Sequence, residues 1–167
     1  MLMGLKPAKA TSQQGFMLLE SLLALLIFSL GILGMVAINA RAIQAATDAE
    51  FRTDAAKFAD EIATQISLNA DRTSTASLAT SLATFAHWSG GTTTCGGFDG
   101  AQSTNAVVTD WLGRLSAVGT GLPGAAAMRQ QIRVETAAGQ FNRVVVTLCW
   151  QVPNAGVRQH TLISYVN

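Results

Sequence analysis

The stretch that decides the fold is Gly15-Phe16-Met17-Leu18-Leu19-Glu20, followed at once by the uncharged run SLLALLIFSLGILGMVAI from Ser21 to Ile38. Those eighteen residues approach the roughly 20 that a helix needs to cross the hydrocarbon core of a bilayer. The run is also longer than the apolar core that a secretory signal usually offers. Glu20 is one carboxylate at its head, and because an ionisable group in an apolar span is costly, we expect Glu20 to be functional.

The helix is predicted to continue well beyond the apolar run. No proline occurs between Gly15 and Leu122, and after Ala40 the pattern becomes amphipathic. The apolar residues of this second part share one helix face: Phe51, Ala55, Phe58, Ile62 and Ile66. We therefore expect one helix from Phe16 to about Asn69, with residues 16–40 spanning a membrane and the amphipathic residues 41–70 packing under a head.

Residues 71–167 are expected to form that globular head. Short helices are predicted over residues 75–87 and over 111–118, the second with Asp110 as its N-cap. Alternating and β-branched residues predict three strands over residues 128–136, 142–152 and 158–166. The fold class is therefore α+β, a long N-terminal helix packed against a small antiparallel sheet.

The N-terminal features together resemble the start of a type IV prepilin. The segment Met1–Gly15 resembles a prepilin leader, because it is short, carries Lys6 and Lys9 but no acid, and ends in glycine. Phe16 and Glu20 match the first and fifth residues of mature pilins. The resemblance implies cleavage between Gly15 and Phe16, N-methylation of Phe16 and a role for Glu20 in assembly. A simple membrane anchor would explain the apolar run but neither Gly15-Phe16 nor Glu20.

Within the type IV pilin superfamily, the segment SLGILGM from Ser29 to Met35 resembles the G-L-L-G signature of PilV-type minor pilins. The order of Asp110-Trp111-Leu112, Leu122-Pro123-Gly124 and a strand ending in Trp150 is also similar to that group. The resemblance implies a low-copy structural subunit for pilus assembly or priming. Such a subunit lies in the cytoplasmic (inner) membrane with its head in the periplasm, and then enters the pilus.

The same resemblance implies the partners. They are the prepilin peptidase, other minor pilins, the major pilin and, before assembly, the lipid of the cytoplasmic membrane. A minor pseudopilin of a type II secretion system shares this N-terminus and is one alternative, and a pilus-tip adhesin is another. The sequence leaves open whether the pilus serves motility, adhesion or DNA uptake.

Two cysteines, Cys95 and Cys149, lie in the expected head. A pilin head folds outside the cytoplasm, where disulfides persist, so the even count favours one bridge; two unpaired buried thiols are the alternative. Strand alternation places Cys149 on the face opposite Val144, Val146, Leu148 and Trp150. Cys95 lies in a Gly-rich loop. A bridge would therefore pin this loop across the outer face of the sheet.

Nothing in the sequence indicates catalysis. The formal charge of +1 becomes −1 if Lys6 and Lys9 are removed, and no basic patch remains, so direct nucleic-acid binding is not expected. His87 and His160 have no metal-ligand spacing and are expected on the surface or in loops. We expect no metal, no cofactor and no enzyme activity, and we assign Trp111 and Trp150 to the core.

Overall fold

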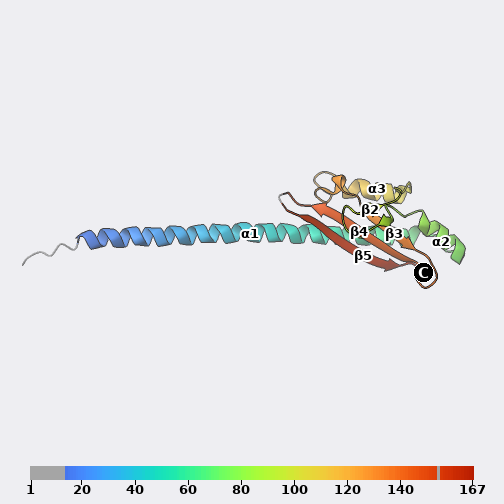
Figure 1. The fold of residues 1–167 in the computed structure, drawn as a ribbon, viewed down its shortest axis with the longest axis horizontal. Helices are drawn as coiled ribbons and strands as arrows, with labels where there is room; N and C mark the ends of the chain where they lie inside the picture. The colour runs from blue at the N-terminus through green and yellow to red at the C-terminus, as the bar shows by residue number, and fades with distance from the viewer. Residues whose placement is uncertain (1–13, 154) are drawn as a thin grey trace, which may run out of the picture. The chain divides into compact units, whose positions relative to one another are not determined.

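The computed structural model describes residues 14–153 and 155–167 (Figure 1). The chain divides after Ala46 into two units, and the helix α1 (Gln14–Asn69) contributes to both. The other elements all belong to the second unit. In order they are α2 (Thr75–Ala83), β1 (Gly90–Gly91), β2 (Phe98–Asp99), α3 (Ala106–Leu115), the 3-10 helix η1 (Ala125–Ala127), β3 (Gln131–Glu135), β4 (Arg143–Gln151) and β5 (Val157–Tyr165). The fold is α+β, as the sequence predicts.

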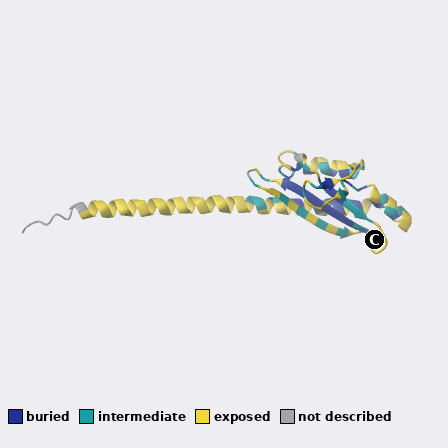
Figure 2. Ribbon diagram, viewed as in Figure 1, coloured by how far each residue is buried: buried dark blue, intermediate teal, exposed yellow. Residues whose placement is uncertain are grey.

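The first unit is a helix that exposes apolar side chains on every side. All residues from Phe16 to Ala46 are exposed, as Figure 2 shows for this part of α1. The helix is long and apolar enough to cross a membrane, with a mean hydropathy of 2.6 in its most apolar window. Because none of the described residues covers this surface, it is suited to an apolar environment such as the interior of a membrane.

The second unit is built on the apolar stripe of α1. Ala55, Ile62 and Ile66 are fully buried on this stripe, which the spacing of apolar residues predicts. They belong to one hydrophobic cluster with the inner face of the sheet and with α2 and α3. Trp111 of α3 is also fully buried, and its indole Nε1 donates a hydrogen bond of 2.9 Å to the Phe58 carbonyl of α1. This bond satisfies the polar atom of the ring inside the core.

The sheet is a three-stranded antiparallel meander with β4 in the centre. Its register pairs Thr147 with Gln131 of β3 and with Thr161 of β5. The residues predicted for the inner face of β4 lie in the core: Val144, Val146, Leu148 and Trp150. Thr147 and Cys149, on the other face, are also fully buried. Both faces of β4 are therefore covered, the outer one by the segment that contains β1 and β2.

Strand β3 begins three residues later than predicted. Just before its first residue, the side chain of Gln130 replaces backbone hydrogen bonds to β4. The amide of Gln130 faces the backbone of Cys149: its Oε1 accepts from the Cys149 N–H at 2.7 Å, and its Nε2 donates to the Cys149 carbonyl at 2.9 Å. Gln130 is 2% exposed. The side chain thus reproduces the two hydrogen bonds that the backbone of Arg129, the residue opposite Cys149 in this register, would make if the ladder continued.

The N-cap predicted for α3 is wrong. The capping residue is Asn105, whose side chain accepts from the Val107 N–H at 3.0 Å, whereas Asp110 lies exposed inside the helix. The helix starts earlier because Val108 belongs to the same buried face as Trp111 and Leu115. α2 is shorter than predicted, because the backbone of His87 leaves the helix and pairs with Ile132.

Candidate functional site

The residues expected at the processing site lie at the beginning of α1. Gly15 and Phe16 are both in helical backbone, and the Phe16 side chain is 73% exposed. The leader predicted over Met1–Gly15 falls mostly on residues 1–13, which lie outside the described residues. The cleavage between Gly15 and Phe16 and the methylation of Phe16 therefore remain predictions from the sequence.

Glu20 is the one charged residue between Phe16 and Ala40. Its side chain is exposed and makes no hydrogen bond or ion pair with any described residue. The nearby hydroxyls are satisfied locally: Ser21 Oγ donates to the Leu18 carbonyl at 3.0 Å, and Ser29 Oγ donates to the Leu25 carbonyl at 2.7 Å. The serines thus suit an apolar surrounding, whereas no described residue offsets the charge of Glu20.

Gly31 and Gly34 lie inside the same exposed stretch of α1. A Cβ added to either glycine meets no atom within 4 Å, so no packing within the chain requires them. Each glycine weakens the helix by about 1 kcal/mol relative to alanine. Two explanations remain open. The glycines allow another helix to approach closely, or they are neutral small residues in a membrane span.

In the head, Cys95 and Cys149 form a disulfide bond. Cys149 is fully buried on the outer face of β4, and Cys95 lies in the loop between β1 and β2. The Gln159 side chain of β5 also holds this loop, since its Oε1 accepts from the Cys95 N–H at 3.3 Å and its Nε2 donates to the Thr93 carbonyl at 2.9 Å. The bridge lies across the outer face of the sheet, the arrangement that strand alternation predicts for it.

Gln131 anchors the start of the same segment. Its Nε2 lies within hydrogen-bond distance of three backbone carbonyls, those of Trp88 at 2.9 Å, Gly90 at 3.0 Å and Thr92 at 3.3 Å. Its Oε1 is buried with no partner among the described residues. Gly91 is required in this turn: its φ is +73°, and a Cβ there would lie 2.2 Å from the Gly97 carbonyl oxygen. The sequence reading missed Gln131, because its alternation pattern looks like that of any solvent-facing strand residue.

An ion pair ties β5 to α1 within the second unit. Arg158 Nε lies 2.9 Å from Asp48 Oδ1, and Arg52 Nε lies 3.2 Å from Asp48 Oδ2. The hydrogen bond from Arg158 is the main cause that lowers the pKa of Asp48 below its usual value. Asp48 therefore stays ionised and works as a structural contact, which leaves it unsuited to proton transfer near neutral pH.

His87 lies in the loop between α2 and β1, which agrees with the sequence prediction of a surface or loop position, but it is buried, with only 5% exposed. Its Nδ1 accepts a hydrogen bond of 3.0 Å from the Ser103 backbone N–H, and burial lowers the pKa of the ring. No group of three or more possible metal ligands occurs among the described residues.

Comparisons with protein-family models, with curated proteins and with solved structures find no match to this chain.

Proposed function

We propose that this chain is a membrane-anchored filament subunit, a PilV-type minor pilin that takes part in type IV pilus assembly or priming at low copy. The observation that carries the proposal is Glu20, an exposed carboxylate with no partner among the described residues, on a helix whose surrounding surface is apolar. A simple membrane anchor gains nothing from such a charge, because its insertion is costly. A subunit that must find a neighbour in an apolar assembly gains a partner-specific contact.

The Gly15-Phe16 junction supplies the chemistry of that contact. Cleavage between these residues would create an amine on Phe16, one helical turn from Glu20 on the same chain. The carboxylate can meet this amine or the amine of a neighbouring subunit. Attraction between the two charges is much stronger in an apolar core than in water, although their desolvation offsets much of the gain. The pair would therefore favour one axial register between neighbouring helices over the others.

The disulfide supports a head that folds outside the cytoplasm. Bridges such as Cys95–Cys149 persist in oxidising compartments and are rare in the cytosol. With residues 16–40 in the membrane, a periplasmic head follows. The same topology suits a minor pseudopilin of a type II secretion system, so the test must separate the two kinds of filament.

The test compares the wild type with Glu20→Ala in cells that carry an active prepilin peptidase. Glu50→Ala is the matched control, because Glu50 is an exposed acid on the same helix beyond the apolar run. Mass spectrometry of the mature N-terminus should give methylated Phe16 for all three proteins. Wild type and Glu50→Ala should appear in sheared pili, whereas Glu20→Ala should stay in the membrane fraction.

Three results would contradict the proposal. A mature N-terminus other than Phe16 would exclude processing as a prepilin. Normal entry of Glu20→Ala into pili would remove the assembly role of the carboxylate. Processing at Phe16 with recovery only in secretion-system filaments would identify a pseudopilin and exclude the pilus.

A further inference from the structure

The three-stranded sheet has one edge that the described residues leave open, on β5. Backbone groups of successive residues in a strand point alternately to its two sides. Gln130 binds the N–H and the carbonyl of Cys149 from the β3 side, so the backbone groups of the preceding residue, Leu148, point to β5. Leu148 is paired there with His160. The alternate residues of β5 therefore direct their backbone groups away from the sheet: Val157, Gln159, Thr161, Ile163 and Tyr165.

This edge lacks the features that usually protect a free strand. The outward backbone groups of those five residues make no hydrogen bond with any described residue. The strand pairs with β4 in an unbroken register from Val157 to Tyr165 and contains no proline or lysine. Its one permanent charge, Arg158, is held by Asp48 of α1. Because long edges are usually blunted by such residues or by bulges, or are covered by another segment, the edge of β5 is suited to pairing with a further strand.

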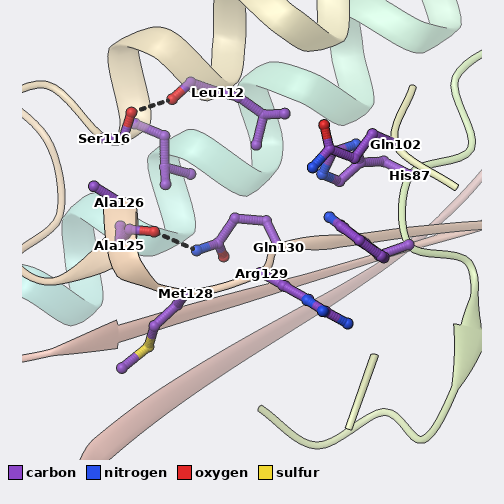
Figure 3. Close-up of a pocket in the computed structure, with 11 residues that line it drawn as sticks. His87, Gln102, Leu112, Ser116, Ala125, Ala126, Met128, Arg129 and Gln130 are labelled. Carbon is purple, nitrogen blue, oxygen red and sulfur yellow. Dashed lines mark hydrogen bonds between the residues drawn. The ribbon is translucent and has the colours of Figure 1, made fainter. Parts of the chain in front are cut away.

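The opposite edge of the sheet, on β3, is covered. Ile132 directs its backbone groups outward and exchanges two hydrogen bonds with the backbone of His87, at 2.8 and 3.0 Å. Beside it, the side chain of Gln130 donates to the Ala125 carbonyl at 3.5 Å, as the dashed line in Figure 3 marks. Among the described residues, no backbone segment covers β5 in this way.

A groove of about 300 Å³ lies between β5 and an exposed face of α1. Residues 162–164 line it on the side of β5, and the residues from α1 include Asp60 and Leu68. Leu68 is 73% exposed and Ile163 is 51% exposed, so apolar side chains lie uncovered on both sides. Because side chains of a strand alternate between its two faces, a strand added to β5 would direct every second side chain toward α1.

The groove has a defined direction and one charge. Asp48 of α1 binds Arg158 near the start of β5, and Arg72, which follows α1, donates to the Asn167 carbonyl beyond the end of β5 at 2.8 Å. The two elements therefore run in the same direction, and Asp60 lies at the end of the groove nearer the start of β5. Asp60 is the one charged residue among the described residues that line it, and none of them forms an ion pair with it. A basic residue of an added antiparallel strand would meet this carboxylate near the C-terminal end of that strand.

We propose that the edge of β5 pairs in antiparallel orientation with an extended segment of another polypeptide, one that carries alternating apolar side chains and a basic residue toward its C-terminal end. The outward backbone groups of Thr161, Ile163 and Tyr165 bind its main chain. Its apolar side chains lie in the groove beside Leu68, and its basic residue meets Asp60. In strand addition of this kind, main-chain hydrogen bonds give affinity and the alternate side chains give specificity.

A second copy of this chain suits the edge less well. Two β5 strands paired in antiparallel orientation are related by a two-fold axis perpendicular to the sheet. Residues 47–69 of α1 would then run in opposite directions in the two copies, whereas chains anchored in one membrane by the same helix enter it in the same direction. This choice of occupant rests on the proposed membrane anchor, but the open edge does not.

The probe is the peptide acetyl-Thr-Val-Thr-Val-Thr-Lys-amide, added to the full chain in zwitterionic detergent micelles. Its threonines direct their N–H groups to β5, and its valines and lysine face the groove. Amide hydrogen exchange, followed by NMR, should be fast at Ile163 and slow at Leu162 in the free protein, because the N–H of Leu162 is bonded to β4. The peptide should slow exchange at Ile163 by about tenfold or more and leave Leu162 unchanged.

Two matched pairs identify the backbone contact. N-methylation of the peptide's threonines should weaken binding by about tenfold or more, because each methyl group removes a donor that faces β5, whereas N-methylation of its valines should leave binding unchanged. In the protein, Ile163→Pro should abolish binding and Ile163→Val should preserve it. Proline is tolerated at an edge position whose N–H points to solvent, and the shift dispersion of the buried Trp111 indole shows that the head is folded. Asp60→Asn should weaken binding by about threefold, because an exposed ion pair contributes little.

The proposal is overturned if exchange at Ile163 is not slowed at ~1 mM peptide, or if the two N-methylated peptides bind equally. Protection of Ile163 without peptide, together with a dimeric mass in sedimentation, would identify a second copy as the occupant and exclude a segment of another chain. If Ile163→Pro does not fold, the two N-methylated peptides alone decide the result. None of these outcomes bears on the proposed role of Glu20, which is tested by filament assembly.

Discussion

Replacing Cys95 with alanine should destabilise the head without changing its fold. The bridge that this change removes joins residues 54 positions apart in the sequence. In the folded head, the loop around Cys95 is also held by the hydrogen bonds from Gln131 and Gln159. These contacts do not depend on the sulfur atoms. The main effect of the substitution therefore falls on the unfolded chain, which gains conformational freedom when the cross-link is lost.

The chain-entropy relation gives the magnitude. For a closed loop of this length, the loss in the free energy of unfolding is about 4 kcal/mol at 25 °C. Domains are typically stable by about 5–15 kcal/mol, so the variant would keep a folded head with a small margin. If the urea m-value is about 2 kcal/mol/M, the midpoint of unfolding should fall by roughly 2 M.

Urea titration in detergent micelles measures this shift, followed by the fluorescence of the buried Trp111 and Trp150. Reduction of the wild type should give the same shift as Cys95→Ala, and reduction of Cys95→Ala should give none. The helical circular dichroism of residues 16–46, which make no part of the head, should persist through the transition. An unchanged midpoint in the reduced wild type, or two reactive thiols in the unfolded, unreduced protein, would refute the reasoning.

Three further predictions concern α1 and the head. Gly31→Ala should stabilise the isolated helix by about 1 kcal/mol, because the added methyl group meets open space, and its helical signal should persist to a higher temperature. If this variant fails to enter filaments, Gly31 is needed for contact with another chain. If it enters normally, Gly31 is a neutral small residue. The stability of the head should fall as the pH drops below about 6.5, because His87 is then protonated in the unfolded chain while burial keeps the folded ring neutral. The urea midpoint should therefore fall between pH 7.5 and pH 5.5, and it should fall less in His87→Gln than in the wild type. Gln131→Ala should cost about 2 kcal/mol and speed hydrogen exchange in residues 88–92, since carbonyls of that turn lose their donor; exchange as slow as in the wild type would contradict the anchoring role.

The sequence predicts those parts of the fold in which one face of a helix or strand packs against the hydrophobic core. The spacing of Ala55, Ile62 and Ile66 predicts which side of α1 is buried, and the alternation of Val144 with Val146 predicts the inner face of β4. Periodicity reports such contacts directly, because every residue of the stripe has the same kind of partner. The exposed apolar surface of residues 16–46 is also predicted by the sequence, because apolar residues there are not confined to one face of the helix.

The parts that the sequence does not predict depend on contacts between distant segments. Gln131 meets carbonyls about 40 residues away, and nothing in its neighbourhood distinguishes it from a surface residue. The burial of His87 follows from its pairing with Ile132, which the short-range pattern cannot show. The wrong N-cap at Asp110 has a different cause. The first turn of α3 is only half buried, so its residues give a weaker hydrophobic pattern than Trp111 does, and the pattern places the start of the apolar face at Trp111. Cap chemistry alone allows both Asn105 and Asp110.

The side chain of Gln130 also decides how β3 aligns with β4 while the sheet forms. A slip of one residue is opposed by the hydrophobic pattern, because it would turn Ile132 away from the core. A slip of two residues keeps every side chain on its own face, so that pattern offers no protection. One such slip would bring Met128 to the position of Gln130, and the Met128 side chain cannot both accept from the Cys149 N–H and donate to the Cys149 carbonyl. Two buried backbone groups would then stay unpaired, at about 1–3 kcal/mol each. One polar residue in the core thus disfavours an alignment that burial alone would allow.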